Sequence, residues 1–474
     1  MNAPMSTPRI CHAEHMPGTV AQDAHVPVLI VGGGACGLTA ALMLHDAGVD
    51  CAVLERDATP LGSSALSSGF IPAPGTQAQR AAGIDDSPER FAADISAKAK
   101  GRAAPHLVQA YARAIGPALD ALQGRHGLQW QVLDGFLYPG HSVRRMHATP
   151  EKTGLGLMGR LANAVTAADI PLITEATVRE LWVNAQRRVI GVGYERPDGT
   201  LEHLACDALI LACNGFGGNP AMVRELLPEM RDALFAGHTG NDGSAIAWGQ
   251  ALGARLADLG GYQGHGSWAI PQGALISWAL MMEGGIQVNA LGERFHDETQ
   301  GYSEASVHVL AQPGGVAWNV FDAPILALAR GFPDFVDAEA AGAVKHCDSV
   351  QALAATIGCE ESKLIATLAS LASASGQNDQ IRRIFARPLQ APFCAVKVTG
   401  ALFHTQGGLD IDAQCRVLSR HGQPFPNLLA AGGAARGVSG DAVWGYLSGN
   451  GLLSAVAGGY IAAHTAAELT RQKV

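Results

Sequence analysis

The stretch VPVLIVGGGACGLTAALML, residues 26–44, decides the fold of this chain. A short apolar run over residues 26–31 ends in three glycines and precedes a helical pattern over residues 35–47. A second apolar run over residues 50–54 closes on Glu55. Strand, glycine turn, helix and second strand in this order predict a parallel βαβ unit.

The glycines of this turn have the spacing Gly32-x-Gly34-x-x-Gly37. Gly32 permits the turn, Gly34 lets backbone N–H groups approach a pyrophosphate, and Gly37 lets the helix pack on the strand. The N-terminus of the helix offers unpaired N–H donors to phosphate. Glu55 follows at the distance expected of an acid that accepts hydrogen bonds from a ribose. We therefore predict a dinucleotide site, which this motif alone leaves open between NAD and FAD.

A second loop bears on that choice. Residues 62–69 read GSSALSSG, a hydroxyl-rich segment that is longer than an NAD dehydrogenase needs. Serine O–H and backbone N–H groups in such a loop can hold both a pyrophosphate and a flavin. The loop favours FAD over NAD.

Composition limits the possible functions of the chain. Of its 474 residues 48% are hydrophobic and 16% are charged, so it can build a large core in two or three domains. The net charge of −9 comes without a basic run, which argues against a nucleic-acid partner. The nine cysteines form no C-x-x-C pair or zinc-like cluster, a pattern that favours a reduced, cytoplasmic protein without a metal site.

The pattern along the chain predicts two units and a tail. Residues 1–25 are polar, lack the apolar core of a signal peptide, and are expected to form a flexible tail. Two long uncharged stretches, residues 26–44 and 442–467, are interrupted by glycines, so we interpret them as buried elements and not as membrane spans. Strand-like runs at both ends of the chain predict a Rossmann-like α/β domain made of residues 26–262 and 396–474. Residues 263–395 would form an inserted α+β cap.

Seven sequence blocks, in order, resemble the fumarate reductase and 3-ketosteroid dehydrogenase superfamily of FAD oxidoreductases. They are the βαβ stretch above, LERDATPLGSSALSSGFIPAPGTQAQRAAGIDDSPERF, ALILACNGFGGNPAMV, HTGNDGSAIAWGQALGARL, GERFHDE, FHTQGGLDID and NLLAAGGAARGVSGDAVWGYLSGNGLLSA. The resemblance implies an FAD domain and a cap with the active site between them. The start of the last helix would face the flavin and stabilise the negative charge of its reduced form.

The resemblance also implies a set of cofactor-binding residues. Residues 58–70 contain no His of the kind that attaches FAD covalently in some relatives, so a noncovalent cofactor is expected. No C-x-x-C-H haem motif is present. The expected FAD contacts are Gly32, Gly34, Ala35, Gly37, Glu55, Arg56, Ser63, Ser64, Ser68, Gly69, Gly433, Ser448, Asn450, Gly451 and Leu452.

Two tyrosines stand where the fumarate-reducing members of the superfamily carry arginines. Tyr302 follows GERFHDE, and Tyr446 lies in GYLSGN; the latter pattern, with Ser448, is similar to that of the Δ4-(5α) 3-ketosteroid dehydrogenases. A guanidinium suits a carboxylate, whereas two phenols suit a ketone, one polarising the carbonyl and the other removing an α proton. Proton removal requires a phenol pKa below the usual value of about 10. His404 matches a substrate-contacting His of the fumarate reducers.

These observations predict an FAD dehydrogenase that desaturates a steroid or smaller alicyclic ketone next to its carbonyl. The predicted catalytic residues are Tyr302, Tyr446, Ser448 and His404, and which tyrosine is the base stays open. One alternative is a soluble enoate or enone reductase like fumarate reductase, and another is a flavin-binding scaffold without turnover. The sequence identifies no electron acceptor. We interpret His238, His265 and His296 as structural, whereas Trp268, Trp278, Met281 and Met282 are either pocket or core residues.

Overall fold

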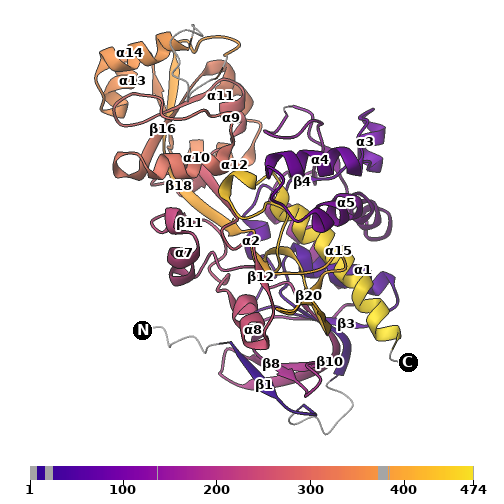
Figure 1. Ribbon diagram of the computed structural model, residues 1–474. Helices are drawn as coiled ribbons and strands as arrows, with labels where there is room; N and C mark the ends of the chain where they lie inside the picture. Colours follow the sequence, from indigo (N-terminus) through magenta and orange to yellow (C-terminus); the bar gives the residue numbers. More distant parts are fainter. Residues whose placement is uncertain (1–7, 17–24, 136, 372–382, 384, 473–474) are drawn as a thin grey trace.

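The computed structural model describes residues 8–16, 25–135, 137–371, 383 and 385–472. The chain builds two main sheets, each with its own hydrophobic core. Figure 1 shows the second sheet and helices α9 to α14 at one end of the molecule, with the first sheet at the other. No helix within the described ranges is both long and apolar enough to cross a membrane.

The predicted βαβ unit forms the centre of the first sheet. Strand β2 (His25–Val31) runs parallel to β3 (Cys51–Leu54), and α1 (Ala35–Asp46) connects them. Gly32 has φ of +109°, and a Cβ there would lie 2.5 Å from the carbonyl oxygen of Ala212. Glycine is thus required at this turn for both conformation and space.

Helix α1 packs on the closing helix α15 (Asn450–Arg471), and both are buried along most of their length. At the crossing, a Cβ on Gly459 would lie 2.4 Å from the carbonyl oxygen of Cys36. Small residues therefore let these helices approach closely. Figure 1 shows the two labels side by side although the helices come from opposite ends of the sequence.

Strand β10 (Leu201–Leu211) organises the rest of the first sheet. It pairs in parallel with β2 and β21 (Pro424–Ala430) and antiparallel with β9 (Val189–Glu195). Beyond β9 lie β8 and β1.

The expectation of a flexible tail over residues 1–25 is wrong for one segment. Arg9–His12 forms β1, which pairs in parallel with β8 (Thr177–Val183). An ion pair of 2.5 Å joins Arg9 to the buried Glu180 of β8. The pairing depends on a partner strand far away in the sequence, so local polarity did not indicate it. Residues 1–7 and 17–24 of this stretch lie outside the described residues.

The second sheet is built around β18 (Phe393–Thr405). This strand pairs antiparallel with β13 (Tyr262–Ala269), β16 (Val316–Asp322) and β17 (Val344–Cys347), and in parallel with β11 (Leu234–Phe235). A Rossmann-like domain that resumes at residue 396 would pair residues 396–402 in parallel, whereas β18 pairs antiparallel with three of its neighbours. A fully buried strand reads as a continuous apolar run in either kind of sheet, so the pattern could not separate the two. The cap sheet also extends beyond the expected insert at residues 263–395, into β11 and the end of β18.

The remaining helices and strands complete the two units and form two small sheets, β12–β19 and β4–β6–β5. Their bounds are α2 (Gly62–Ala65), β4 (Ile71–Pro72), α3 (Gln77–Ala81), α4 (Pro88–Lys98), α5 (Pro105–His126), β5 (Gln131–Val132), β6 (Met146–Ala148), α6 (Gly154–Ala167), β7 (Leu172–Ile173), α7 (Pro220–Leu226), α8 (Ser244–Leu252), β12 (Leu256–Ala257), β14 (Ala274–Leu275), α9 (Ala279–Met282), β15 (Ile286–Val288), α10 (Tyr302–Leu310), α11 (Ala323–Ala329), α12 (Pro333–Ala340), α13 (Val350–Ile357), α14 (Glu361–Ser370), β19 (Gly408–Leu409) and β20 (Arg416–Leu418).

Candidate active site

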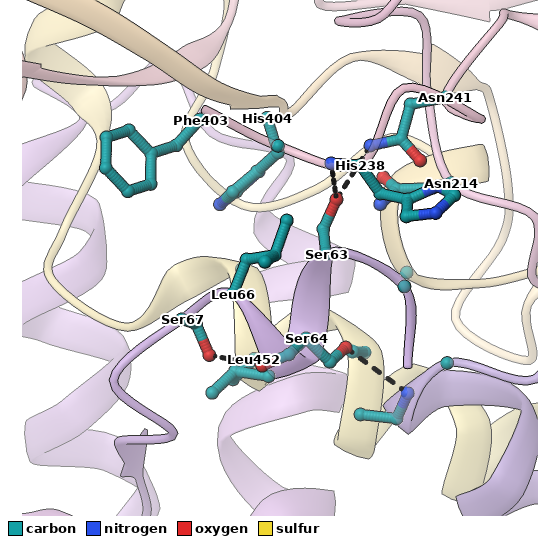
Figure 2. Close-up of a pocket in the computed structure, with 18 of the residues that line it drawn as sticks. Ser63, Ser64, Leu66, Ser67, Asn214, His238, Asn241, Phe403, His404 and Leu452 are labelled. Atoms are coloured by element: carbon teal, nitrogen blue, oxygen red, sulfur yellow. Dashed lines mark hydrogen bonds between the residues drawn. The ribbon is translucent and has the colours of Figure 1, made fainter. Parts of the chain in front are cut away.

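One continuous pocket connects the two units. Its walls include the carboxyl ends of β2, β3 and β10, the N-termini of α1 and α15, and the cap strands β13 and β18. The carboxyl ends of parallel strands are where open α/β sheets place their ligands. Residues 62–69 are called the serine loop below. Figure 2 shows this loop beside Phe403 and His404 at the end of β18 and Leu452 near the start of α15.

Glu55 lies at the end of β3 and is almost fully buried. Its Oε2 accepts a hydrogen bond of 2.7 Å from the N–H of Gly33, and its Oε1 accepts one of 2.9 Å from the N–H of Asp57. Burial raises the pKa of this carboxyl group, and the two backbone hydrogen bonds oppose that shift. A carboxylate has further acceptor positions, so Glu55 can still accept hydrogen bonds from the hydroxyl groups of a ribose.

The serine loop is held by contacts on three sides. Ser64 Oγ accepts from the N–H of Ala35 at the start of α1, at 3.3 Å. Ser63 Oγ accepts from the backbone N–H of His238 at 3.0 Å and from Asn241 Nδ2 at 2.8 Å (Figure 2). Ser68 Oγ instead donates to Asp334 of the cap at 3.2 Å, so this serine links the two units.

Several features of the pocket besides the spacing of its glycines fit FAD. The N-termini of α1 and α15 both face it, and each offers backbone donors and a partial positive charge. A Cβ on Gly433 would lie 2.0 Å from Asn214 Oδ1, and one on Gly451 would lie 2.4 Å from His404 Nε2, so backbone forms the surface there. Trp248 also lines the pocket, and its buried Nε1 has no partner among the described residues. When bound, FAD supplies a hydride acceptor.

All but two of the predicted cofactor residues line this pocket. Gly37 does not; a Cβ there would lie 1.9 Å from the carbonyl oxygen of Gly32, so its role is packing. Asn450 is fully buried behind the pocket and donates to Ser439 Oγ at 2.9 Å. Asn450 starts α15 but does not line the pocket.

The four predicted catalytic residues meet at the cap end of the pocket. Tyr302 begins α10, and Tyr446 and Ser448 lie in the turn before α15. The two phenol rings are 6.1 Å apart at an angle of 61°, and the His404 ring lies 5.6 Å from that of Tyr446. The N–H of Gly451 donates to the Tyr446 oxygen at 3.3 Å.

Burial controls the protonation of this group. It raises the pKa of Tyr302 to about 12, although hydrogen bonds from Ser448, Tyr446 and the backbone of Gly449 lower it in part. It also raises the pKa of Tyr446 well above the usual phenol value, and Tyr302 adds to that shift. Neither pKa lies below the usual phenol value, because desolvation outweighs the hydrogen bonds.

Sequence reasoning missed several residues of the site. His265 and His238 were interpreted as structural, yet both line the pocket, as do Tyr138 and Phe403. His265 comes from the middle of β13, and no local signal distinguishes it from a packed core histidine. Trp278 lines the pocket as one alternative predicted, whereas Trp268, Met281 and Met282 do not.

Comparison with known proteins places this geometry in a family. Residues 27–452 match the family described as FAD binding domain. The chain belongs to this family. Together with its similarity to fumarate reductases, this match identifies an FAD-dependent oxidoreductase of the fumarate reductase superfamily. The predicted superfamily, the α/β fold and the FAD cofactor are thereby confirmed.

Two curated relatives illustrate the sequence similarity. The NADH:fumarate oxidoreductase of Klebsiella pneumoniae is 28% identical over 461 residues; the match covers 96% of this chain and 49% of that relative. The chain thus spans about half the length of that protein. A probable fumarate reductase of Shewanella frigidimarina is 28% identical over 448 residues, covering 93% of this chain and 74% of the relative.

Two solved structures support the fold. The open conformation of a flavocytochrome c3 fumarate reductase has a TM-score of 0.79 at 26% identity, with 94% of this chain and 78% of that chain covered. The 3-ketosteroid-Δ4-(5α)-dehydrogenase of Rhodococcus jostii RHA1 has a TM-score of 0.74 at 24% identity, with 96% and 99% covered.

Proposed function

We propose that this chain is an FAD-dependent dehydrogenase that desaturates a ketone between its α and β carbons, on a steroid or smaller alicyclic substrate. The observation that carries the proposal is the meeting of Tyr302, Tyr446 and Ser448 at the cap end of the pocket. Among the described pocket residues the one Lys or Arg is Arg56, which is bound to Gly240 and Asp242 beside the serine loop.

Tyr302 is the proposed base. As the α C–H bond breaks, its proton would pass to the Tyr302 oxygen and the β hydrogen would leave as hydride to the cofactor. Ser448 donates a hydrogen bond that favours the phenolate form of Tyr302, which leaves the O–H of Tyr446 for the substrate. The oxygen of Tyr446 accepts a hydrogen bond from the N–H of Gly451. Its O–H would donate to the carbonyl oxygen of the substrate and so acidify the α proton.

The test is a ketone panel. The oxidised holoenzyme is mixed without oxygen with 3-ketosteroids and with cyclohexanone derivatives, and flavin absorbance is followed. We expect at least one ketone to bleach the flavin, with a rate about 10²–10⁴-fold lower in Tyr302→Phe. Ser448→Ala should lose less. If both Tyr302→Phe and Tyr446→Phe stay within about threefold of wild type, the proton-transfer group lies elsewhere.

A second candidate is an enoate reductase. The curated relatives above are fumarate reductases, and His404 lines the pocket. Burial lowers the pKa of His404 to about 4, so a neutral ring would meet a carboxylate there. Photoreduced enzyme that passes electrons to fumarate-like acids but not to enones would favour this candidate. Bound FAD that no ketone, enone or acid perturbs would favour a flavin-binding scaffold.

A further inference from the structure

A small second cavity adjoins the tyrosines. Tyr302, Tyr446 and Ser448 line both this cavity and the main pocket, and Lys98 and Glu304 line its other side. Its volume of about 10 Å³ is close to what one water molecule needs. Tyr302, Tyr446 and Ser448 therefore separate the substrate pocket from a space that one water molecule can occupy.

Glu304 is placed to exchange a proton with that water. It lies two residues after Tyr302 in the first turn of α10. One carboxylate oxygen, Oε1, bonds Lys98 Nζ. The other, Oε2, is buried and has no hydrogen-bond partner among the described residues. A buried carboxylate oxygen without a partner is costly, and a water in the adjoining cavity would satisfy it.

The surroundings keep this oxygen accessible from the cavity. Gly301 has φ of +128°, and a Cβ there would lie 2.9 Å from Glu304 Oε2. Lys98 lies in the last turn of α4, also donates to the carbonyl oxygen of Gln300 at 2.9 Å, and is 14% exposed. The Lys98–Glu304 pair thus stands between the cavity and the solvent.

We propose that Glu304 relays the proton taken up by Tyr302 to solvent, through one water in this cavity. This inference rests on the proposed function. The Tyr302 phenol would give its proton to the water, and the water would give one to the Glu304 carboxylate. Glu304 would release it beside Lys98, so that one proton leaves per turnover and the phenolate fraction of Tyr302 is restored. Glu304 acts through Tyr302 and does not touch the substrate. Burial raises the pKa of Glu304, whereas Lys98 opposes that shift.

The first test follows single-turnover flavin reduction by a ketone that bleaches the wild type, in H₂O and D₂O. Glu304→Gln keeps the shape and the contact with Lys98 but cannot carry the proton. We expect a rate at least about tenfold lower, a larger solvent isotope effect and little change in substrate affinity. Glu304→Asp should recover most of the rate. Glu339→Gln, which breaks an ion pair with Arg330 elsewhere in the cap, is the matched control and should stay within about twofold.

The second test needs no turnover. Infrared titration of the holoenzyme should show a protonated-carboxyl band that is absent in Glu304→Gln and whose midpoint shifts in Tyr302→Phe. The groups that act on Glu304 in this titration are Lys98 and Lys100, with Tyr302 and Tyr262 coupled to it. A Glu304→Gln variant with wild-type rate and isotope effect would overturn the relay. If no ketone bleaches the wild type, the proposed function fails. The infrared test still decides the relay in that case. The relay is refuted if the protonated-carboxyl band of Glu304 is absent, or if Tyr302→Phe leaves the midpoint of that band unchanged.

Discussion

The imidazole of His265 is stacked on the phenol of Tyr302, with ring centroids 4.7 Å apart and 19° between the planes. His265 Nδ1 accepts the N–H of Ser267 at 3.1 Å, which places the proton of the neutral ring on Nε2. Burial lowers the pKa of His265 to about 3. The ring is therefore uncharged at neutral pH and orients Tyr302 without adding charge to the site.

Loss of this stack should slow the reaction. An aromatic pair contributes about 0.5–1.5 kcal/mol, so His265→Ala should reduce the rate of flavin reduction by about two- to tenfold. His265→Phe retains a ring and should stay closer to wild type. Stopped-flow measurement with a ketone that bleaches the wild type checks both variants. Equal losses in the Ala and Phe variants would show that the imidazole itself has a chemical role.

The rate should depend on pH through Tyr302. Because the pKa of Tyr302 is raised to about 12, the phenolate fraction grows about tenfold per pH unit below that value. Flavin reduction at saturating ketone should therefore rise from about pH 7 to about pH 10 without a plateau. Tyr302→Phe should lose this slope. A profile that is flat above about pH 5 would instead assign the base to His404, whose pKa is lowered to about 4.

The cofactor should be noncovalent and held through Glu55. Acid or heat should release intact FAD from the protein, since residues 58–70 contain no His. Glu55→Gln removes a charged acceptor and should weaken FAD binding by about 10- to 100-fold in titrations of the apoprotein. Glu195→Gln, which breaks a partly exposed ion pair with Arg179, is the control. Flavin that stays with the precipitated protein would contradict a noncovalent cofactor.

Dicarboxylates of three or four carbons should bind weakly. Among the described residues that line the cap end of the pocket, Tyr302, Tyr446, His265 and His404 are the titratable groups nearest to the proposed reaction, and all are neutral near pH 7. A carboxylate buried without a charged partner is costly, so malonate, succinate and fumarate should have dissociation constants of about millimolar or weaker. Flavin difference spectra measure this directly. Micromolar binding would favour the enoate reductase.

Sequence and structure contributed differently to these conclusions. The βαβ unit, its glycine turn and Glu55 follow from local patterns, because turn conformation and hydrophobic period depend on neighbouring residues. The pair Tyr302 and Tyr446 could be suggested only by resemblance. The two residues are far apart in the chain and come together only because the cap packs beside the N-terminus of α15.

The local sequence pattern by itself determined that residues 26–54 form a dinucleotide-binding βαβ unit, because the motif is complete within one short segment. The tertiary structure alone decided that Arg9–His12 joins a sheet, that β18 runs antiparallel in the cap, and that His265 stacks on Tyr302. It also decided the protonation of the site. Desolvation depends on every residue packed around a group. It raises both phenol pKa values, whereas the proton removal expected from the sequence required one of them to fall.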